Sequence, residues 1–141
     1  MSRELRRIVV KRKNISFKGD KYGHWWTEIL DGPDGNPLES YGWWPKNPVG
    51  VIDTLVGVEG ELNGQTSFGG SPTHDPHQGD SADEEFHPVI LDIRTDDEVI
   101  DAIRRFAQGY TGEWRWTFGW GQNCHTFQVA LMKYAGLQDP R

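Results

Sequence analysis

The chain has 141 residues, a single cysteine and a formal net charge of −6. This length predicts one domain, 1–141, large enough to bury a core without disulfides, and the acidic balance argues against general affinity for nucleic acid. No apolar run approaches the roughly 20 residues that cross a bilayer, and residues 8–10 are too short for the apolar part of a signal peptide. We therefore expect no membrane insertion, and a cytoplasmic location or export by a non-Sec route.

A β-hairpin is predicted for the first third of the chain. Residues 4–13 are expected to be extended, and residues 18–20 indicate a turn. Residues 22–30 are aromatic and rich in β-formers, and residues 31–37 combine Asp, Gly, Pro and Asn in a strong turn signal. Residues 38–44 are then expected to return as the second strand of the hairpin.

The middle of the chain has little periodicity. Residues 45–87 are rich in Gly and Pro and predict a long irregular loop, of the kind that forms a lid or a binding loop. Val89, Leu91 and Ile93 then recur at every second position, which favours a strand over residues 88–94 with these side chains on one face.

Two helices are predicted in the last third of the chain. Thr95 and Glu98 have the spacing of a capping box, and apolar residues recur at helical spacing as far as Tyr110. A last helix is expected over residues 124–135, with Gly136 as a typical helix end. Its inward stripe is expected to carry Cys124, Phe127, Leu131 and Tyr134. The elements together predict an α+β domain, a twisted antiparallel sheet with two main helices packed on it.

Cys124 is the first candidate for chemistry. It is expected in the first turn of the last helix, where unpaired backbone N–H groups and the helix dipole favour an anionic sulfur. Its spacing to Phe127 and Leu131 places it on the inward face of that helix. A lone cysteine at a helix start is more often a core residue, so the catalytic interpretation needs a second group.

His24 is the candidate for that second group. Strand alternation puts His24, Trp26 and Glu28 on one face of the predicted hairpin. If that face meets the start of the last helix, the imidazole comes within about 3 to 4 Å of the thiol, which is the arrangement that acyl transfer requires. His125 should point about 100° away from Cys124 around the helix, so we expect a surface residue there.

The segment Asn123-Cys124-His125-Thr126-Phe127 resembles the nucleophile segment of the circularly permuted papain-like proteins. These include the lecithin retinol acyltransferase-like, PPPDE-type and permuted NlpC-type groups, in which the histidine comes first, on a strand, and the cysteine last, on a helix. The resemblance covers residues 22–44 and 96–137. It implies a permuted papain-like fold and a thiol hydrolase, amidase or peptidase that cleaves an amide or acyl bond through a thioester. Cell-wall-type peptides are one substrate class that it suggests, and no cofactor or metal is expected.

The resemblance also implies roles for individual residues. Cys124 would be the nucleophile, and His24 would be the general base and later the general acid. A third group normally orients the histidine from the next strand, and Glu39 is the candidate. Hairpin register sets Glu39 opposite Glu28 or Ile29, not opposite His24, so Glu28 or no third residue stays open as an alternative.

Substrate contacts are expected around the same place. The backbone N–H of Cys124 would bind the oxyanion, aided by Gln122 and Asn123, because such donors must already point at the developing charge. Trp25 and Trp43 are expected to line the substrate cleft, since an indole offers a large apolar face and one polar N–H.

Two other classes of protein stay open. Trp25, Trp43 and Trp44 are suited to stacking on a glycan or peptide in a non-catalytic binding module. A zinc-binding protein is less favoured, because two histidines three apart around a proline match no closed-site spacing. The candidate zinc ligands are His74, Asp75, His77, His87, Cys124 and His125. The acidic residues 75–85 are suited to a basic partner, although such blocks are commonly only solvated.

Overall fold

The computed structural model describes residues 2–17, 20–47, 57–114 and 123–141. They form an α+β structure with antiparallel sheets and two helices, which confirms this part of the prediction. The turn expected at residues 18–20 lies outside the described residues, apart from Asp20 at the start of a strand.

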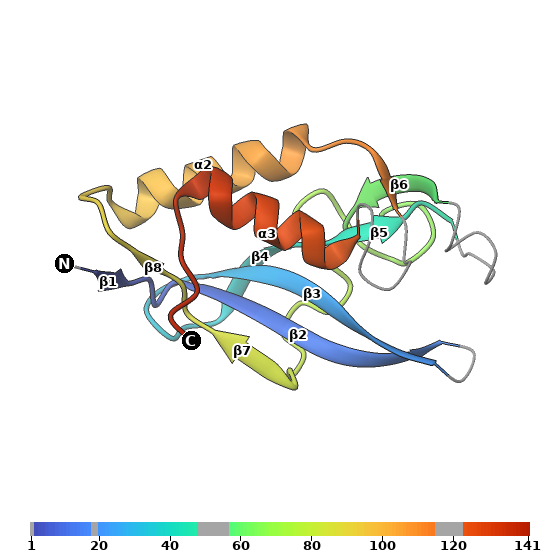
Figure 1. Cartoon of the computed structure of the whole chain (residues 1–141), viewed down its shortest axis with the longest axis horizontal. Helices are drawn as coiled ribbons and strands as arrows, with labels where there is room; N and C mark the ends of the chain where they lie inside the picture. Colours follow the sequence, from blue (N-terminus) through green and yellow to red (C-terminus); the bar gives the residue numbers. More distant parts are fainter. Residues whose placement is uncertain (1, 18–19, 48–56, 115–122) are drawn as a thin grey trace.

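The largest sheet has four antiparallel strands in the order β4-β3-β2-β7 (Figure 1). β2 (Ile8–Phe17) and β3 (Asp20–Leu30) form its long central pair, and β4 (Pro37–Tyr41) pairs with β3 across the predicted turn. β7 (Glu84–Phe86) lies along the other edge of β2. The predicted hairpin is confirmed as far as Tyr41, and its register sets Glu39 opposite Ile29. The expected second strand does not continue to residue 44, because residues 43–45 form a separate strand in another sheet.

Two smaller sheets complete the β-structure. β6 (Val58–Leu62) pairs with β5 (Trp43–Pro45) on one side and with β9 (Glu113–Trp114) on the other. β1 (Arg3–Glu4) pairs with β8 (Val89–Ile90) near the end of the molecule where both chain termini lie (Figure 1).

The strands depart from the sequence prediction in two places. β6 and β7 lie within residues 45–87, where an irregular loop was expected, because tertiary pairing forms strands that local periodicity does not mark. Gly60 in β6 shows why the pattern is weak: a Cβ there would lie 2.5 Å from the Trp43 indole. β8 has only two residues, since its partner β1 is equally short, and Leu91 and Ile93 are exposed and not in a strand.

Both predicted helices are confirmed, as α2 (Asp96–Gly109) and α3 (Cys124–Ala135). Thr95 and Glu98 form the expected capping box, and Gly136 ends α3 in a left-handed conformation with φ of 72°. The helices lie side by side over one face of the main sheet (Figure 1). Tyr134 is the exception to the predicted stripe, because it is 55% exposed. In the described part of the chain, no helix has the length and apolar character needed to span a membrane.

The two faces of β3 meet different surroundings. Thr27 and Ile29 point toward the helices, where the Thr27 hydroxyl donates to Gln128 of α3 and Ile29 is fully buried in the core. His24 and its alternating neighbours point the other way, toward residues 63–80. The His24 side chain therefore points away from the helices, and of the described helix residues only Cys124, at the start of α3, interacts with it through its side chain.

Candidate active site

Helix α3 begins at the cysteine because the preceding residue is a strong N-cap. The Asn123 side-chain oxygen accepts hydrogen bonds from the backbone N–H groups of His125 and Thr126, at 3.0 and 3.1 Å. The Thr126 hydroxyl accepts in return from the backbone N–H of Asn123, at 2.7 Å. Cys124 is the first helical residue and is buried. Its sulfur therefore lies at the positive end of the helix dipole.

Three aromatic rings surround the buried His24 imidazole. The Trp26 ring is stacked on it, with centroids 5.6 Å apart and 16° between the planes. The centroids of Trp44 and His77 lie 4.4 and 5.1 Å from that of His24. Because the face of an indole attracts a cation, the two tryptophans favour the protonated imidazolium.

A carboxylate fixes the direction of the His24 ring. His24 Nε2 donates to Asp75 Oδ2 at 3.2 Å and lies 3.4 Å from Oδ1. Asp75 is itself buried, and it accepts further hydrogen bonds from Trp44 Nε1 at 2.7 Å and from the backbone N–H of His77 at 2.8 Å. A buried carboxylate with this many donors stays ionised and holds the imidazole in one orientation.

Asp75 is placed by the end of strand β4. Its backbone N–H donates to the Ser40 hydroxyl at 2.7 Å, and the Asn63 side chain bonds both Gly42 N and Ser40 O, at 2.9 and 3.0 Å. The carboxylate touches the backbone at Gly42, where a Cβ would lie 2.2 Å from Oδ2. Only a residue without a side chain allows this approach.

Burial and charge act against each other on this pair. Burial lowers the pKa of His24, and it is the largest single effect, but the charge and hydrogen bond of Asp75 together with the Cys124 side chain raise that pKa to about 10. Burial raises the pKa of Asp75, yet the His24 charge and the hydrogen bonds from His24, Trp44 and His77 lower it below its ordinary value. An imidazolium facing a carboxylate is thus the stable state at neutral pH.

The Cys124 side chain meets the same imidazole. A hydrogen bond between the two side chains, and their electrostatic interaction, both contribute to the raised pKa of His24. The structure therefore brings the two predicted residues together, in the series Cys124, His24, Asp75. Such a series can hold a thiolate beside a proton donor.

Neither glutamate that was considered for the third position contacts His24. Glu39 accepts two hydrogen bonds from Arg104 of α2, at 2.7 and 2.8 Å, and one from the Tyr41 hydroxyl at 2.7 Å. Glu28 shares the face of His24, but its carboxylate is paired with Lys11 at 2.9 Å. The orienting carboxylate is Asp75 instead, which comes from residues 63–80 and not from the neighbouring strand.

The residues expected around the substrate lie in different places. Trp43 is buried in the core, where its ring is stacked on Phe127 and its exposed fraction is 2%. The Asn123 side-chain oxygen is occupied by the helix cap. Gln122 lies outside the described residues. Trp25 is half-buried on β3 and its ring lies 5.0 Å from that of His125, which is exposed as expected.

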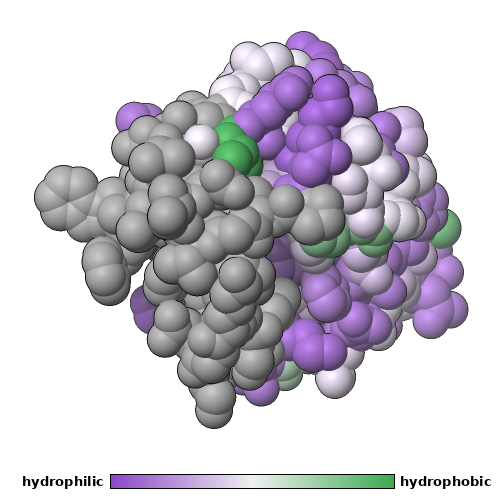
Figure 2. All heavy atoms as spheres, turned by 90° about the vertical axis from the view of Figure 1, so that its right-hand side faces the viewer, coloured by the Kyte–Doolittle hydropathy of each residue, from purple (hydrophilic) through white to green (hydrophobic). Residues whose placement is uncertain are grey.

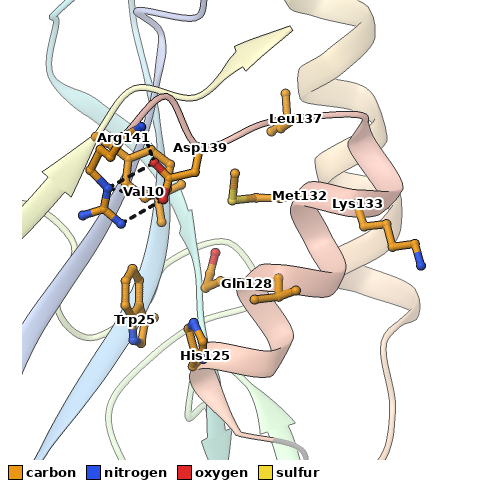
Figure 3. A pocket seen from close by; sticks show the side chains of 11 residues that line it. Val10, Trp25, His125, Gln128, Met132, Lys133, Leu137, Asp139 and Arg141 are labelled. Carbon is orange, nitrogen blue, oxygen red and sulfur yellow. Dashed lines mark hydrogen bonds and ion pairs between the residues drawn. The ribbon is translucent and has the colours of Figure 1, made fainter.

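Trp25 and His125 line a pocket of about 410 Å³ between α3, the main sheet and the last residues of the chain (Figure 3). Each of them directly follows a residue of the candidate dyad in sequence. The remaining lining is largely apolar, with charged groups at the C-terminal segment, where Arg141 donates to Asp139. The apolar lining consists of Val10, Phe86, Val129, Met132 and Leu137.

The histidines of the zinc hypothesis are engaged separately. His74 Nδ1 lies 2.9 Å from the Thr73 hydroxyl, His77 Nδ1 lies 2.9 Å from Asp80, and His87 Nδ1 lies 2.7 Å from a backbone carbonyl oxygen. Within the described ranges, no group of three or more His, Cys, Asp or Glu side chains is placed to hold a metal ion.

Asp75 is the site residue that sequence reasoning did not find. It stands in the segment His74-Asp75-Pro76-His77, which the sequence suggests only as a source of metal ligands and as the start of an acidic segment. Comparison of the chain with models of known protein families, with curated proteins and with solved structures gives no match. The function must therefore be inferred from the geometry of the site.

Proposed function

We propose that the protein is a thiol hydrolase, an amidase or peptidase of the circularly permuted papain-like kind. The observation that carries the proposal is the buried series of Cys124, His24 and Asp75 at the start of α3. The chain order, with a strand histidine first and a helix cysteine last, supports it. One departure from the expected pattern is that the orienting carboxylate comes from residues 63–80 and not from the next strand.

The reaction follows from the charges of these groups. The Cys124 thiolate attacks the carbonyl carbon of an amide, and the His24 imidazolium gives its proton to the leaving nitrogen as the C–N bond breaks. The products of this half are a free amine and a thioester on Cys124. Neutral His24 then takes a proton from water, whose oxygen attacks the thioester, and the acid leaves as the thiolate–imidazolium pair returns. Asp75 stabilises the imidazolium in both halves.

The pocket beside Trp25 and His125 is the proposed place for the apolar part of the substrate. It is lined mainly by apolar side chains and by the residues that follow His24 and Cys124 in sequence, although neither dyad residue itself lines it. By contrast, the described surface at the end of the molecule that carries β5 and β6 is largely hydrophilic, with only small apolar areas (Figure 2). The pocket is thus the better candidate for an acyl or side-chain group.

Thiol reactivity tests the proposal without a known substrate. Because His24 balances the charge of the sulfur, iodoacetamide at about pH 6 should alkylate Cys124 faster than it alkylates a free small thiol. Cys124→Ala should stay folded and lose both labelling and all turnover of peptide or acyl substrates. Cys124→Ser is the matched control for the size of the side chain. Labelling no faster than that of a free thiol, in folded protein, would count decisively against the proposal.

A non-catalytic binding module is the second candidate, and the pocket is the observation that favours it. In that case a peptide or glycan would bind equally well to the wild type and to Cys124→Ala, and Trp25→Ala would remove binding. Trp43 is a poor candidate for such stacking, because its ring is buried against Phe127. Binding titrations followed by tryptophan fluorescence separate the two functions.

A further inference from the structure

A second buried ion pair lies on the same face of β3 as His24. Lys11 Nζ and Glu28 Oε1 are 2.9 Å apart, and their side chains are only 12% and 1% exposed. The reaction described above uses neither residue. A buried pair of this kind is weak support for stability, because apolar residues of similar size are often equally good. A role other than stability is therefore needed to explain why Lys11 and Glu28 are buried here.

The pair holds the turn that carries Asp75. Glu28 Oε2 accepts from the backbone N–H of Gly79 at 2.7 Å, and Lys11 Nζ donates to the Asp80 carbonyl at 2.9 Å. Two neighbouring residues of the turn are thus fixed to the sheet through opposite charges. The distance along the chain from Gly79 back to Asp75 is only four residues.

The turn itself transmits this placement to Asp75. The backbone N–H of Gln78 donates to the Asp75 carbonyl at 2.9 Å, and the backbone N–H of His77 donates to the Asp75 carboxylate at 2.8 Å. The N–H of Asp80 donates to the His77 carbonyl at 2.9 Å. Residues 75–80 therefore form a hydrogen-bonded turn that is bonded to Glu28 and Lys11.

The Glu28 carboxylate also fixes the Trp26 ring, which packs against one side of the His24 imidazole. Trp26 Nε1 donates to Glu28 Oε2 at 2.9 Å, and the Trp26 ring is the one stacked on His24. Two partners of His24, the Asp75 carboxylate and the Trp26 ring, are thus linked to one oxygen of Glu28, Trp26 directly and Asp75 through the turn that ends at Gly79. We propose that Glu28, neutralised by Lys11, is a positioning residue that holds Asp75 and Trp26 against His24.

For its catalytic meaning this inference rests on the proposed function, but its test does not need turnover. Two double variants remove both charges together. Lys11→Met/Glu28→Gln keeps an oxygen that can accept from Gly79 and Trp26, whereas Lys11→Met/Glu28→Leu has no acceptor. Each is examined by thermal unfolding, by NMR titration of the His24 imidazole and by the rate of Cys124 alkylation at pH 6.

The two variants should differ although both are neutral. We expect the Gln variant to keep the His24 titration midpoint and the alkylation rate of the wild type. The Leu variant should fold, yet its His24 midpoint should fall by about one pH unit or more, with an alkylation rate about tenfold lower. If the folded Leu variant matches the wild type, Glu28 is not a positioning residue. If the Gln variant falls as far as the Leu variant, the charge matters and not the position, which equally overturns the proposal.

Glu28→Asp covers the case in which the Leu variant does not fold. It keeps the charge and the pairing with Lys11 but withdraws the carboxylate from Gly79 by one methylene. A lower His24 midpoint in the Asp variant supports the inference, and an unchanged midpoint contradicts it. Slow alkylation of the wild type would instead overturn the proposed function while leaving the His24 titrations as a valid measure of positioning.

Discussion

The two faces of β3 stabilise the protein in different ways. On the helix face, Ile29 is packed in a core of fully buried apolar side chains that includes Phe127 and Leu131. On the opposite face, His24 and Glu28 are equally buried, but each is held by an ion pair and directed hydrogen bonds. Apolar burial is roughly proportional to area and has no direction, whereas charged pairs depend on geometry. One strand can thus place apolar packing on one face and directed polar interactions on the other.

The largest expected effect is a loss of stability on the helix face. Phe127→Ala should lower the free energy of unfolding by about 3–5 kcal/mol, because it removes a fully buried ring from the core. Urea unfolding measures the loss. The His24 titration midpoint of the folded variant should stay that of the wild type. A midpoint that falls with stability would show that the two faces are not separate.

The next effect belongs to the opposite face and should mainly alter reactivity. Asp75→Asn keeps the shape of the side chain but removes its charge, so we expect a stability loss of about 1–3 kcal/mol. The His24 midpoint should drop, and the alkylation rate of Cys124 at pH 6 should fall about tenfold or more. The alkylation rate is measured by quenching the reaction at set times and determining the labelled fraction by mass spectrometry. An unchanged alkylation rate would show that Asp75 does not act on His24.

The pH dependence of stability should report the same pair. Because the pKa of His24 is raised from 6.5 to about 10, its contribution is complete below pH 6.5 and is lost as the pH rises toward 10. Because the pKa of Asp75 is lowered from 3.8, its contribution is complete above that pH and is lost as the pH falls through the folded pKa. Thermal unfolding between pH 5 and 10 should show the alkaline loss in the wild type. The loss should be smaller in Asp75→Asn, and equal losses would contradict the assignment.

The smallest expected effect comes from Glu39, the glutamate on the helix face of the sheet. Glu39→Gln removes one charge from a partly exposed pair with Arg104, so we expect a stability loss of only about 0.2–1 kcal/mol. The His24 midpoint and the alkylation rate should match those of the wild type. A tenfold slower alkylation would restore Glu39 as the residue that acts on His24.

Local signals explain which parts of the fold were predictable. The capping box at Thr95 and the glycine at 136 act within a few residues, and both helices follow from them. Strand β6 was not predictable, because its pairing with β5 and β9 is tertiary and Gly60 interrupts any apolar pattern. Its residues form a strand because they pair with β5 and β9, and the Trp43 ring lies close to Gly60.

The same distinction applies to the candidate site. Cys124 and His24 could be proposed from the sequence, because the start of a helix and the alternation of a strand are local signals. Glu39 was favoured because it lies on the next strand, although its register opposite Ile29 places it on the helix face. Asp75 reaches His24 through hydrogen bonds to Ser40 and Trp44 that no local pattern encodes.

Gly42 shows how much the site depends on a position that has no side chain. Its missing side chain is the space that the Asp75 carboxylate occupies, and a Cβ there would lie 2.2 Å from Oδ2. In a saturation-mutagenesis library selected for thiol reactivity, position 42 should therefore tolerate as little variation as the dyad. A residue that contributes no functional group would then appear in such a map as if it were part of the chemistry.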